Sequence, residues 1–430
     1  MPSYIACLPH RKNGLINYAE RISVCTLILL TIILPTGSVG PVNVKLTALG
    51  LAFSFVLLTK KPDLKFLIFS GLLAILLTAW SIVAQGYGVP IGSTASAANA
   101  LLSAFAPLLV LHLSTRKDKE LASLCIKAAL AGCAIYSTFK IILFVAALLG
   151  FNITALFELM YLKFGYSPIT YNYGWFFRIN TPVDFVLVPA ILSIIYVCPE
   201  MSRASKIALT AIFLTAITIA LSRYLYVYAA FSLASILLGG KRKISTTRTI
   251  LFILIFLIAT TLALIFSDRI FQFLSERYFG EYAEKSDSVR YLIFPPMMEQ
   301  FHSRPLIGSG LGFYIDSTVF FPNAPWNSVL LWLSLLNQFG ILGIIILLAL
   351  FAFPLIVKPK SITSGYLFAI FSYGIFISSG FFNTFLLTSS ASILYFIYSN
   401  LFSHFRAPAI KIQNQLHSAR YGADGLAMKS

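Results

Sequence analysis

Four arginines stand out in this sequence because each lies beside an apolar segment, where a charged side chain is costly in free energy. They are Arg178 in FFRINTPVD, Arg223 in LSRYLY, Arg290 in SVRYLIF and Arg304 in HSRPLIG. A guanidinium group can bind two phosphate oxygens at once, and it stays charged at every physiological pH. Several of them on one face would suit a pyrophosphate. The competing interpretation of each is an interfacial side chain or the partner of a nearby acid.

A general base for an acceptor hydroxyl is expected among the polar residues near these arginines. Glu299 and His302 are three residues apart, so on a helix they would share one face. Either side chain can accept a proton from a hydroxyl group. Asp184 and Asp316 are alternative bases, and His302 could equally be a polar loop residue.

Lys140 and an aromatic-rich stretch are further candidates for substrate binding. Lys140 falls inside an apolar run, where a lysine faces a cavity, meets a partner or extends its amine toward water. Residues 149–183 contain many aromatic side chains, Trp175 among them. Such rings stack on sugar faces, or they form a belt at the membrane interface.

The glycine-rich segment IGSGLGFY does not predict a nucleotide site. Gly308, Gly310 and Gly312 lack the spacing of a dinucleotide fingerprint, and the chain has no Walker lysine pattern. We expect a tight turn or a close backbone approach after Pro305. No cluster of His and carboxylate residues has metal-ligand spacing, so the sequence predicts neither a metal nor a cofactor.

The elements that position these residues must be membrane helices. The 430 residues are 58% hydrophobic and 11% charged, and the mean hydropathy is +0.85, whereas a soluble domain carries about 25% charged residues. The net charge of +17 comes from short basic clusters between apolar runs. That pattern fits the positive-inside rule of membrane proteins and excludes a nucleic-acid partner, which would require a basic face on a soluble domain.

Twelve apolar runs indicate a single all-α membrane domain, residues 1–430, with about 12 transmembrane helices. The runs cover residues 22–36, 42–58, 66–85, 95–113, 123–148, 184–198, 206–221, 224–240, 249–266, 326–350, 364–380 and 385–402. Every second gap is basic, which predicts that those gaps and both termini are cytoplasmic. Two large loops, 149–183 and 267–325, then lie on the opposite side.

Three segments together resemble the O-antigen polymerase and O-antigen ligase superfamily. Residues Arg290–Gly312, RYLIFPPMMEQFHSRPLIGSGLG, are similar to a segment in which an arginine starts a helix that ends in a proline and glycine turn. Ser222–Arg223 resembles the superfamily's serine-arginine site, and Asn327–Gly343 resembles the helix after its large loop. In the ligases a histidine-asparagine pair precedes that helix, whereas Trp326 stands before Asn327 here.

The resemblance implies a metal-independent glycosyltransferase of the bacterial inner membrane that acts at the periplasmic face in lipopolysaccharide biosynthesis. A polymerase transfers the growing glycan from undecaprenyl pyrophosphate to the next lipid-linked repeat unit. A ligase transfers it to lipid A-core instead, and the missing histidine favours the polymerase. A chain-length regulator protein is a further candidate partner, beside the lipid-linked glycan and the bilayer.

The candidate site residues divide into two groups. Those expected to act at the reacting bond are Arg290, Arg223, Glu299 and His302. Those expected to bind pyrophosphate or glycan are Arg178, Arg304, Lys140, Trp175 and Asn327. The competing class is a flippase of lipid-linked oligosaccharides, for which broken helices, midplane ionisable groups and two comparable halves are expected. The concentration of polar residues in two unequal loops favours the enzyme.

Overall fold

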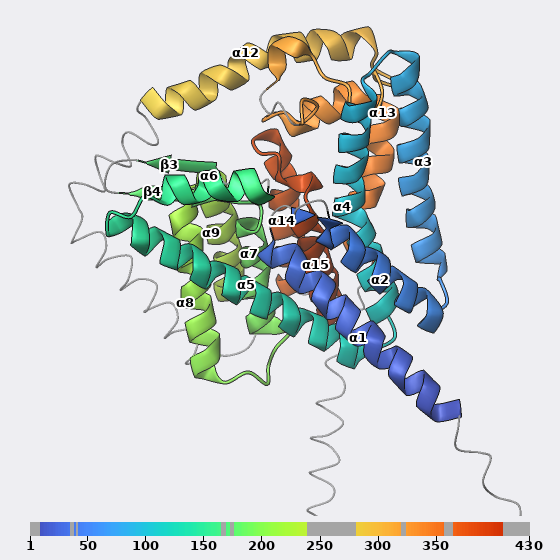
Figure 1. Cartoon of the computed structure of the whole chain (residues 1–430), viewed down its shortest axis with the longest axis vertical. Coiled ribbons are helices and arrows are strands. Elements are labelled where there is room, and N and C mark those ends of the chain that lie inside the picture. The colour runs from blue at the N-terminus through green and yellow to red at the C-terminus, as the bar shows by residue number, and fades with distance from the viewer. Residues whose placement is uncertain are drawn as a thin grey trace, which may run out of the picture.

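The computed structural model describes residues 9–34, 38–39, 42–164, 169–172, 176–238, 281–319, 324–356 and 364–406. Most of these residues are helical (Figure 1). In chain order the helices are α1 (Pro9–Ile33), α2 (Val44–Thr59), α3 (Leu64–Gly86), α4 (Ile91–Thr115), α5 (Lys119–Leu148), α6 (Ile153–Phe164), α7 (Asp184–Tyr196), α8 (Arg203–Ala220), α9 (Arg223–Leu238), α12 (Glu281–Ser303), α13 (Leu331–Phe351), α14 (Ser364–Ser378) and α15 (Ser389–Arg406).

Short elements complete the described part of the chain. Two antiparallel pairs of strands join β1 (Ser38–Val39) to β2 (Val42–Asn43), and β3 (Ile169–Asn172) to β4 (Phe177–Asn180). The 3-10 turns are η1 (Asp316–Thr318), η2 (Phe353–Leu355), η3 (Ser379–Phe381) and η4 (Phe385–Leu387). The β3–β4 hairpin matters for the site because β4 carries Arg178.

The structure is that of an α-helical membrane protein. Six helices in the described ranges are long and apolar enough to cross a bilayer, and they lie in α1, α3, α4, α5, α8 and α13. Shorter apolar helices add Val44–Thr59, Asp184–Tyr196 and Gly365–Phe381. A bilayer core needs about 20 apolar residues per straight span, so the shorter helices cross only with help from their neighbours or from a thinned bilayer.

Eleven of the twelve predicted apolar runs coincide with helices, and the run at 249–266 lies outside the described residues. The two predicted loops contain more structure than expected. Residues 149–183 hold α6 and the β3–β4 hairpin, and residues 267–325 hold α12. Figure 1 shows α12 crossing one end of the bundle, where α3, α4 and α13 meet its C-terminal half.

Polar caps explain where several helices begin. Asn43, Asp63, Asp118 and Ser202 stand at the N-caps of α2, α3, α5 and α8, and each side chain accepts a hydrogen bond from a backbone N–H in the first turn. These bonds satisfy donors that the helix itself leaves free. Polar residues in the gaps between apolar runs therefore mark where the next helix begins.

Ion pairs lie at one end of the bundle. They link the basic gaps between apolar runs, which the sequence predicted to lie on one side of the membrane. The pairs are Arg21 with Asp118 and Glu120, Lys60 with Glu20, Arg116 with Asp63, and Lys127 with Glu200. At the opposite end, Lys45 bonds Ser389 and Trp326 bonds Ser96. The ion pairs therefore join helix ends that flank the basic gaps.

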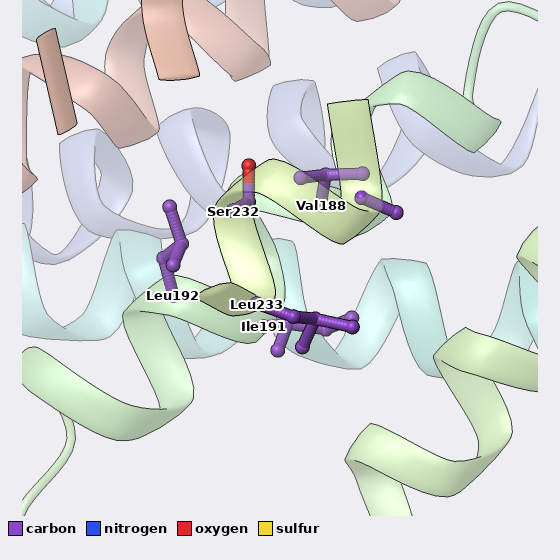
Figure 2. Close-up of a pocket in the computed structure, with 6 residues that line it drawn as sticks. Val188, Ile191, Leu192, Ser232 and Leu233 are labelled. Carbon is purple, nitrogen blue, oxygen red and sulfur yellow. The ribbon is translucent and has the colours of Figure 1, made fainter. Parts of the chain in front are cut away.

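Helix α7 lies at the centre of the described bundle. Every residue from Asp184 to Ile194 is buried, and a helix that is apolar all round belongs in an interior. Figure 2 shows Val188, Ile191 and Leu192 of α7 near Ser232 and Leu233 of α9, and the gap between them leaves no room for a water molecule. Dense packing holds the first residue of α7 in a fixed place.

The glycine segment forms the close backbone approach that the sequence predicted. Gly308 and Gly310 have φ angles of 74° and 98°, in the left-handed region that favours glycine. A Cβ on Gly308 would lie 2.5 Å from the carbonyl oxygen of Gln338, and one on Gly310 would overlap the backbone of Ala84. The segment thus fixes the C-terminal end of α12 against α3 and α13.

Candidate functional site

Arg178 and Arg223 are brought together by the end of α8. Arg178 on β4 donates from Nε to the backbone carbonyl of Ala220 at 2.9 Å. Ala220 is the last residue of α8, and Arg223 is the first residue of α9. Only Leu221 and Ser222 separate Ala220 from Arg223. Arg178 therefore bonds the backbone of the turn that leads to Arg223.

Arg290, on α12, contacts the loop after α14, and that loop packs against the start of α9. Its Nη2 donates to the backbone carbonyl of Phe382 at 3.4 Å. The ring of Phe382 lies 5.7 Å from the ring of Tyr224, the residue after Arg223. The Tyr224 hydroxyl also bonds Ser378 at 2.5 Å, which fixes the end of α14 beside the start of α9. We call Arg178, Arg223 and Arg290 the arginine cluster.

The turn at the centre of the arginine cluster is strained. Leu221 has a φ of 44°, and it is the one residue other than glycine with a positive φ in the described chain. A bulky residue in this region is a genuine outlier that the surroundings must hold in place. Here the Arg178 bond to Ala220 and a 2.7 Å bond from the Tyr226 hydroxyl to the carbonyl of Thr218 hold it.

Lys140 has a buried partner and does not extend to the surface. Its Nζ donates to Asp184 Oδ1 at 2.6 Å. The same oxygen accepts from the Tyr136 hydroxyl at 3.0 Å, while Asp184 Oδ2 accepts from the backbone N–H of Thr181 at 2.8 Å. Of the three interpretations of Lys140, the structure shows the buried partner.

The Lys140–Asp184 pair lies beside the arginine cluster. Thr181, whose backbone N–H donates to Asp184, follows directly after β4, the strand that carries Arg178. Both oxygens of Asp184 are occupied by donors, so this carboxylate is not placed to take a proton from a substrate. The pair instead locks α5, α7 and the end of β4 together, and so positions Arg178.

Glu299, His302 and Arg304 lie away from the arginine cluster, at the other end of α12. Arg290 and Glu299 are separated by roughly 13 Å along the helix at the 1.5 Å rise per residue. Glu299 and His302 are exposed. The Arg304 guanidinium lies 3.6 Å over the ring of Tyr87 and donates to Ser309 Oγ at 3.4 Å. Arg304 therefore supports the glycine segment.

The remaining predicted residues divide between the bundle and the chain outside the described ranges. Trp175 lies outside the described residues. Asn327 is half-buried, and its Oδ1 is buried with no hydrogen-bond partner. Trp326, which stands at the position of the ligase histidine, donates from Nε1 to Ser96 Oγ at 3.1 Å. Asp316 is exposed in η1 and is not near the arginine cluster in sequence or through any described contact.

No group of three or more His, Cys, Asp or Glu side chains in the described ranges could hold a metal ion. No family model, curated protein or solved structure matches this chain. The site is accordingly described from its own residues.

Sequence reasoning missed two contributors to the site. Tyr136 precedes Lys140 by four residues on α5, so the two share one helix face, and that spacing could have identified the pair. Leu221 offered no such signal, because a leucine gives no local indication of a left-handed backbone. The convergence of three arginines from β4, α9 and α12 also required the fold.

Proposed function

We propose that this protein is a polymerase of undecaprenyl-pyrophosphate-linked oligosaccharide repeat units, acting in O-antigen or related surface-polysaccharide synthesis. It transfers the growing glycan from its lipid diphosphate to the next lipid-linked repeat. The observation that carries the proposal is that Arg178 bonds the end of α8, three residues before Arg223. From the other side, Arg290 bonds Phe382, whose ring lies 5.7 Å from that of Tyr224. The resemblance of Arg290–Gly312 and Ser222–Arg223 to the polymerase and ligase superfamily supports it from the sequence.

The proposed chemistry uses the arginine cluster to stabilise the leaving group. The bond between the anomeric carbon and the diphosphate oxygen breaks, and a bond from the acceptor hydroxyl oxygen to that carbon forms. Negative charge develops on the departing diphosphate, where guanidinium groups fixed in advance lower the barrier. The hydroxyl proton leaves to a base or to water.

Glu299 and His302 are assigned a different role from the one that their spacing suggested. A base must lie within hydrogen-bond reach of the proton that it removes, or one water away. Glu299 stands roughly 13 Å along α12 from Arg290, which is too far for a diphosphate held at the cluster. We therefore propose that Glu299 and His302 contact the acceptor glycan, whose repeat unit extends away from the reacting bond.

The proposed orientation places the arginine cluster at the periplasmic face of the inner membrane. The ion-paired end of the bundle carries the basic gaps at Lys60 and Arg116, and the positive-inside rule assigns such gaps to the cytoplasm. The cluster lies at the opposite helix ends. With the run at 249–266 counted as a span, the proposal has twelve helices and two cytoplasmic termini.

A flippase is the alternative that a structural observation favours most. The ion pair of Lys140 and Asp184 is buried, and α13 is interrupted by the non-helical backbone of Gly340. Transporters use both kinds of feature. Here, however, Asp184 is the first residue of α7 rather than a midplane residue, and the interruption accommodates the Gly308 segment. A ligase is the other alternative, and Trp326 in place of its histidine argues against it.

The test is the lipopolysaccharide ladder on a silver-stained gel from a strain deleted for this gene. The strain is complemented with wild type, Arg290→Ala, Arg290→Lys or the control Arg203→Ala, whose exposed side chain lies at the start of α8. Core with a single repeat unit in the deletion and in both Arg290 variants supports the polymerase. A normal ladder from both Arg290 variants at normal protein level contradicts the phosphate-binding role.

The same gel distinguishes the alternatives. Bare core with polymer accumulating on undecaprenyl pyrophosphate identifies a ligase. Bare core with single repeats held on the cytoplasmic face identifies a flippase. Full polymer length and quantity from His302→Ala would remove His302 from the site.

A further inference from the structure

A polar cavity lies near the arginine cluster but is separate from it. Its volume is about 410 Å³, and it is enclosed by α1, α2, α4, the turn before α7 and the start of α15. The polar lining residues include Asn43, Lys45, Ser96, Asn99, Ser389 and Ser390. Among the residues that line this cavity, Lys45 is the only charged one, so the cavity is positive.

The start of α15 adds to the positive character of the cavity. Lys45 Nζ donates to Ser389 Oγ at 2.8 Å, and Ser389 is the first residue of α15. The N-terminus of a helix carries a partial positive charge and favours anions. A lysine and a helix N-terminus that face one cavity, with no carboxylate in its lining, complement an anionic group.

An apolar groove adjoins the polar cavity. Its volume is about 480 Å³, and it is lined by α2, α3 and α4, with Ser70 as the one polar side chain of the lining. Leu46, Leu49 and Leu102 line both the groove and the polar cavity, so the two spaces are adjacent. Leu46 is 60% exposed at this boundary, where a bilayer lipid could enter from the side.

We propose that the cavity and the groove together bind one isoprenoid diphosphate lipid, with its diphosphate at Lys45 and its chain along α2, α3 and α4. This inference rests on the proposed function, which requires two lipid-linked molecules at once. The arginine cluster holds one of them, and the Lys45 cavity holds the other. An isoprenoid lipid has one chain, which the single groove can hold.

The two anion sites are separated by one short turn. Pro182 and Val183 line the Lys45 cavity. The next residue, Asp184, accepts a hydrogen bond from the backbone N–H of Thr181, which follows directly after β4, the strand that carries Arg178. Two lipid diphosphates on either side of this turn would present their glycans to each other at the same end of the bundle.

The test measures how many undecaprenyl diphosphate molecules the full-length protein binds in nanodiscs of phosphatidylcholine, by native mass spectrometry and by titration. We expect two per wild-type protein. Lys45→Gln should bind one molecule as wild type does. Its affinity for the second molecule should fall by about tenfold or more, because a charge-assisted hydrogen bond is lost. Lys45→Arg should retain two. The control is Lys127→Gln, whose side chain pairs with Glu200 at the other end of the bundle.

A second variant tests the tail independently of the charge. A Cβ on Gly50 meets nothing within 4 Å, and Gly50 lines the groove, so Gly50→Leu fills the groove without a clash. Gly71 is equally open but does not line the groove, so Gly71→Leu is its matched control. Gly50→Leu should bind one molecule of undecaprenyl diphosphate, and Gly71→Leu should bind two. Gel filtration establishes that each variant is folded.

The outcomes separate this inference from the proposed function. If the Lys45→Gln and Gly50→Leu variants both bind two molecules, the second site is elsewhere and the inference is overturned. The inference is also overturned if phosphatidylglycerol that purifies with the protein stays at Lys45 and excludes undecaprenyl diphosphate there. In that case, loss of binding in Arg290→Ala would still support the polymerase. If no undecaprenyl diphosphate binds at all, both proposals fail.

Discussion

Lys140 of α5 and Asp184 of α7 form an ion pair of 2.6 Å, and their side chains are 1% and 0% exposed. Burying two charges removes them from water, and their mutual attraction offsets that loss only when further hydrogen bonds satisfy them. Tyr136 and the backbone of Thr181 supply those bonds. The network therefore works as one unit that fixes the start of α7 and, through it, the end of β4.

Removing one partner of this pair should be far worse than removing both. We expect Asp184→Leu to lower the free energy of unfolding by about 3 to 5 kcal/mol, because Lys140 would remain buried without its carboxylate. The double variant Lys140→Met with Asp184→Leu should recover most of that loss. Thermal unfolding of detergent-purified protein, followed by gel filtration, measures both. Equal destabilisation by the single and the double variant would argue that the pair contributes through its geometry and not its charge.

The glycine segment should tolerate no side chain at Gly310. A methyl group there would overlap the backbone of Ala84 on α3, and the left-handed backbone adds strain for any residue with a Cβ. We expect Gly310→Ala to reduce the yield of folded protein severely. Gly50→Ala is the control, because its Cβ meets nothing within 4 Å. A folded, active Gly310→Ala protein at normal yield would mean that the segment does not pack against α3 in this way.

Trp80 joins the segment before Gly308 to the interruption of α13. Its Nε1 donates to the carbonyl of Ile307 at 2.7 Å and to the carbonyl of Phe339 at 3.0 Å. Trp80→Phe removes this donor and takes one hydrogen bond from each carbonyl. We expect the free energy of unfolding to fall by about 1 to 3 kcal/mol, measured by thermal unfolding of detergent-purified protein. Tyr291→Phe, which removes a polar group from a side chain that is 78% exposed, should change stability by less than about 0.5 kcal/mol.

Membrane helices were predictable because their requirement is simple: about 20 apolar residues in a row. Only the resemblance of Arg290–Gly312 to a helix-containing segment indicated helix α12, which the apolar pattern alone placed in a loop. It has no long apolar run, and Pro295 and Pro296 lie inside it, where proline removes a backbone donor and disfavours helix. Helix α12 packs against α13. A contact between segments so arranged cannot be predicted from the local pattern of apolar and polar residues.

The candidate site was predictable by residue type and not by arrangement. Arg178, Arg223 and Arg290 stood out because arginine beside apolar sequence is unusual, yet Arg304 stood out equally and supports the glycine segment instead. Lys45 was overlooked because a lysine at the start of an apolar run is ordinary at a membrane interface. Only the fold shows that it faces a cavity with Ser389.

Asp63 predicts how stability depends on pH at the ion-paired end of the bundle. Burial raises the pKa of this carboxyl, but the hydrogen bonds from the Phe66 N–H and from Arg116, together with nearby positive charges, hold the pKa below its usual value. The Arg116 guanidinium lies 2.5 Å from Asp63 Oδ2. A carboxyl whose pKa is lowered by folding stabilises the folded state above its unfolded pKa, about 3.9. The stabilisation is lost as the pH falls from there through the lower folded pKa.

Asp63→Asn tests this dependence while keeping the helix cap. An asparagine can still accept the hydrogen bond from the Phe66 N–H at the start of α3, but it has no charge for Arg116. At pH 7 we expect the free energy of unfolding of the variant to be about 1 kcal/mol lower than that of wild type. As the pH falls below about 4 the difference should narrow, and it should close only once the pH passes the lowered folded pKa of Asp63. Thermal unfolding of both proteins between pH 7 and pH 3 measures the difference. No difference in stability between the two proteins at pH 7 would assign the role of Asp63 to the cap alone.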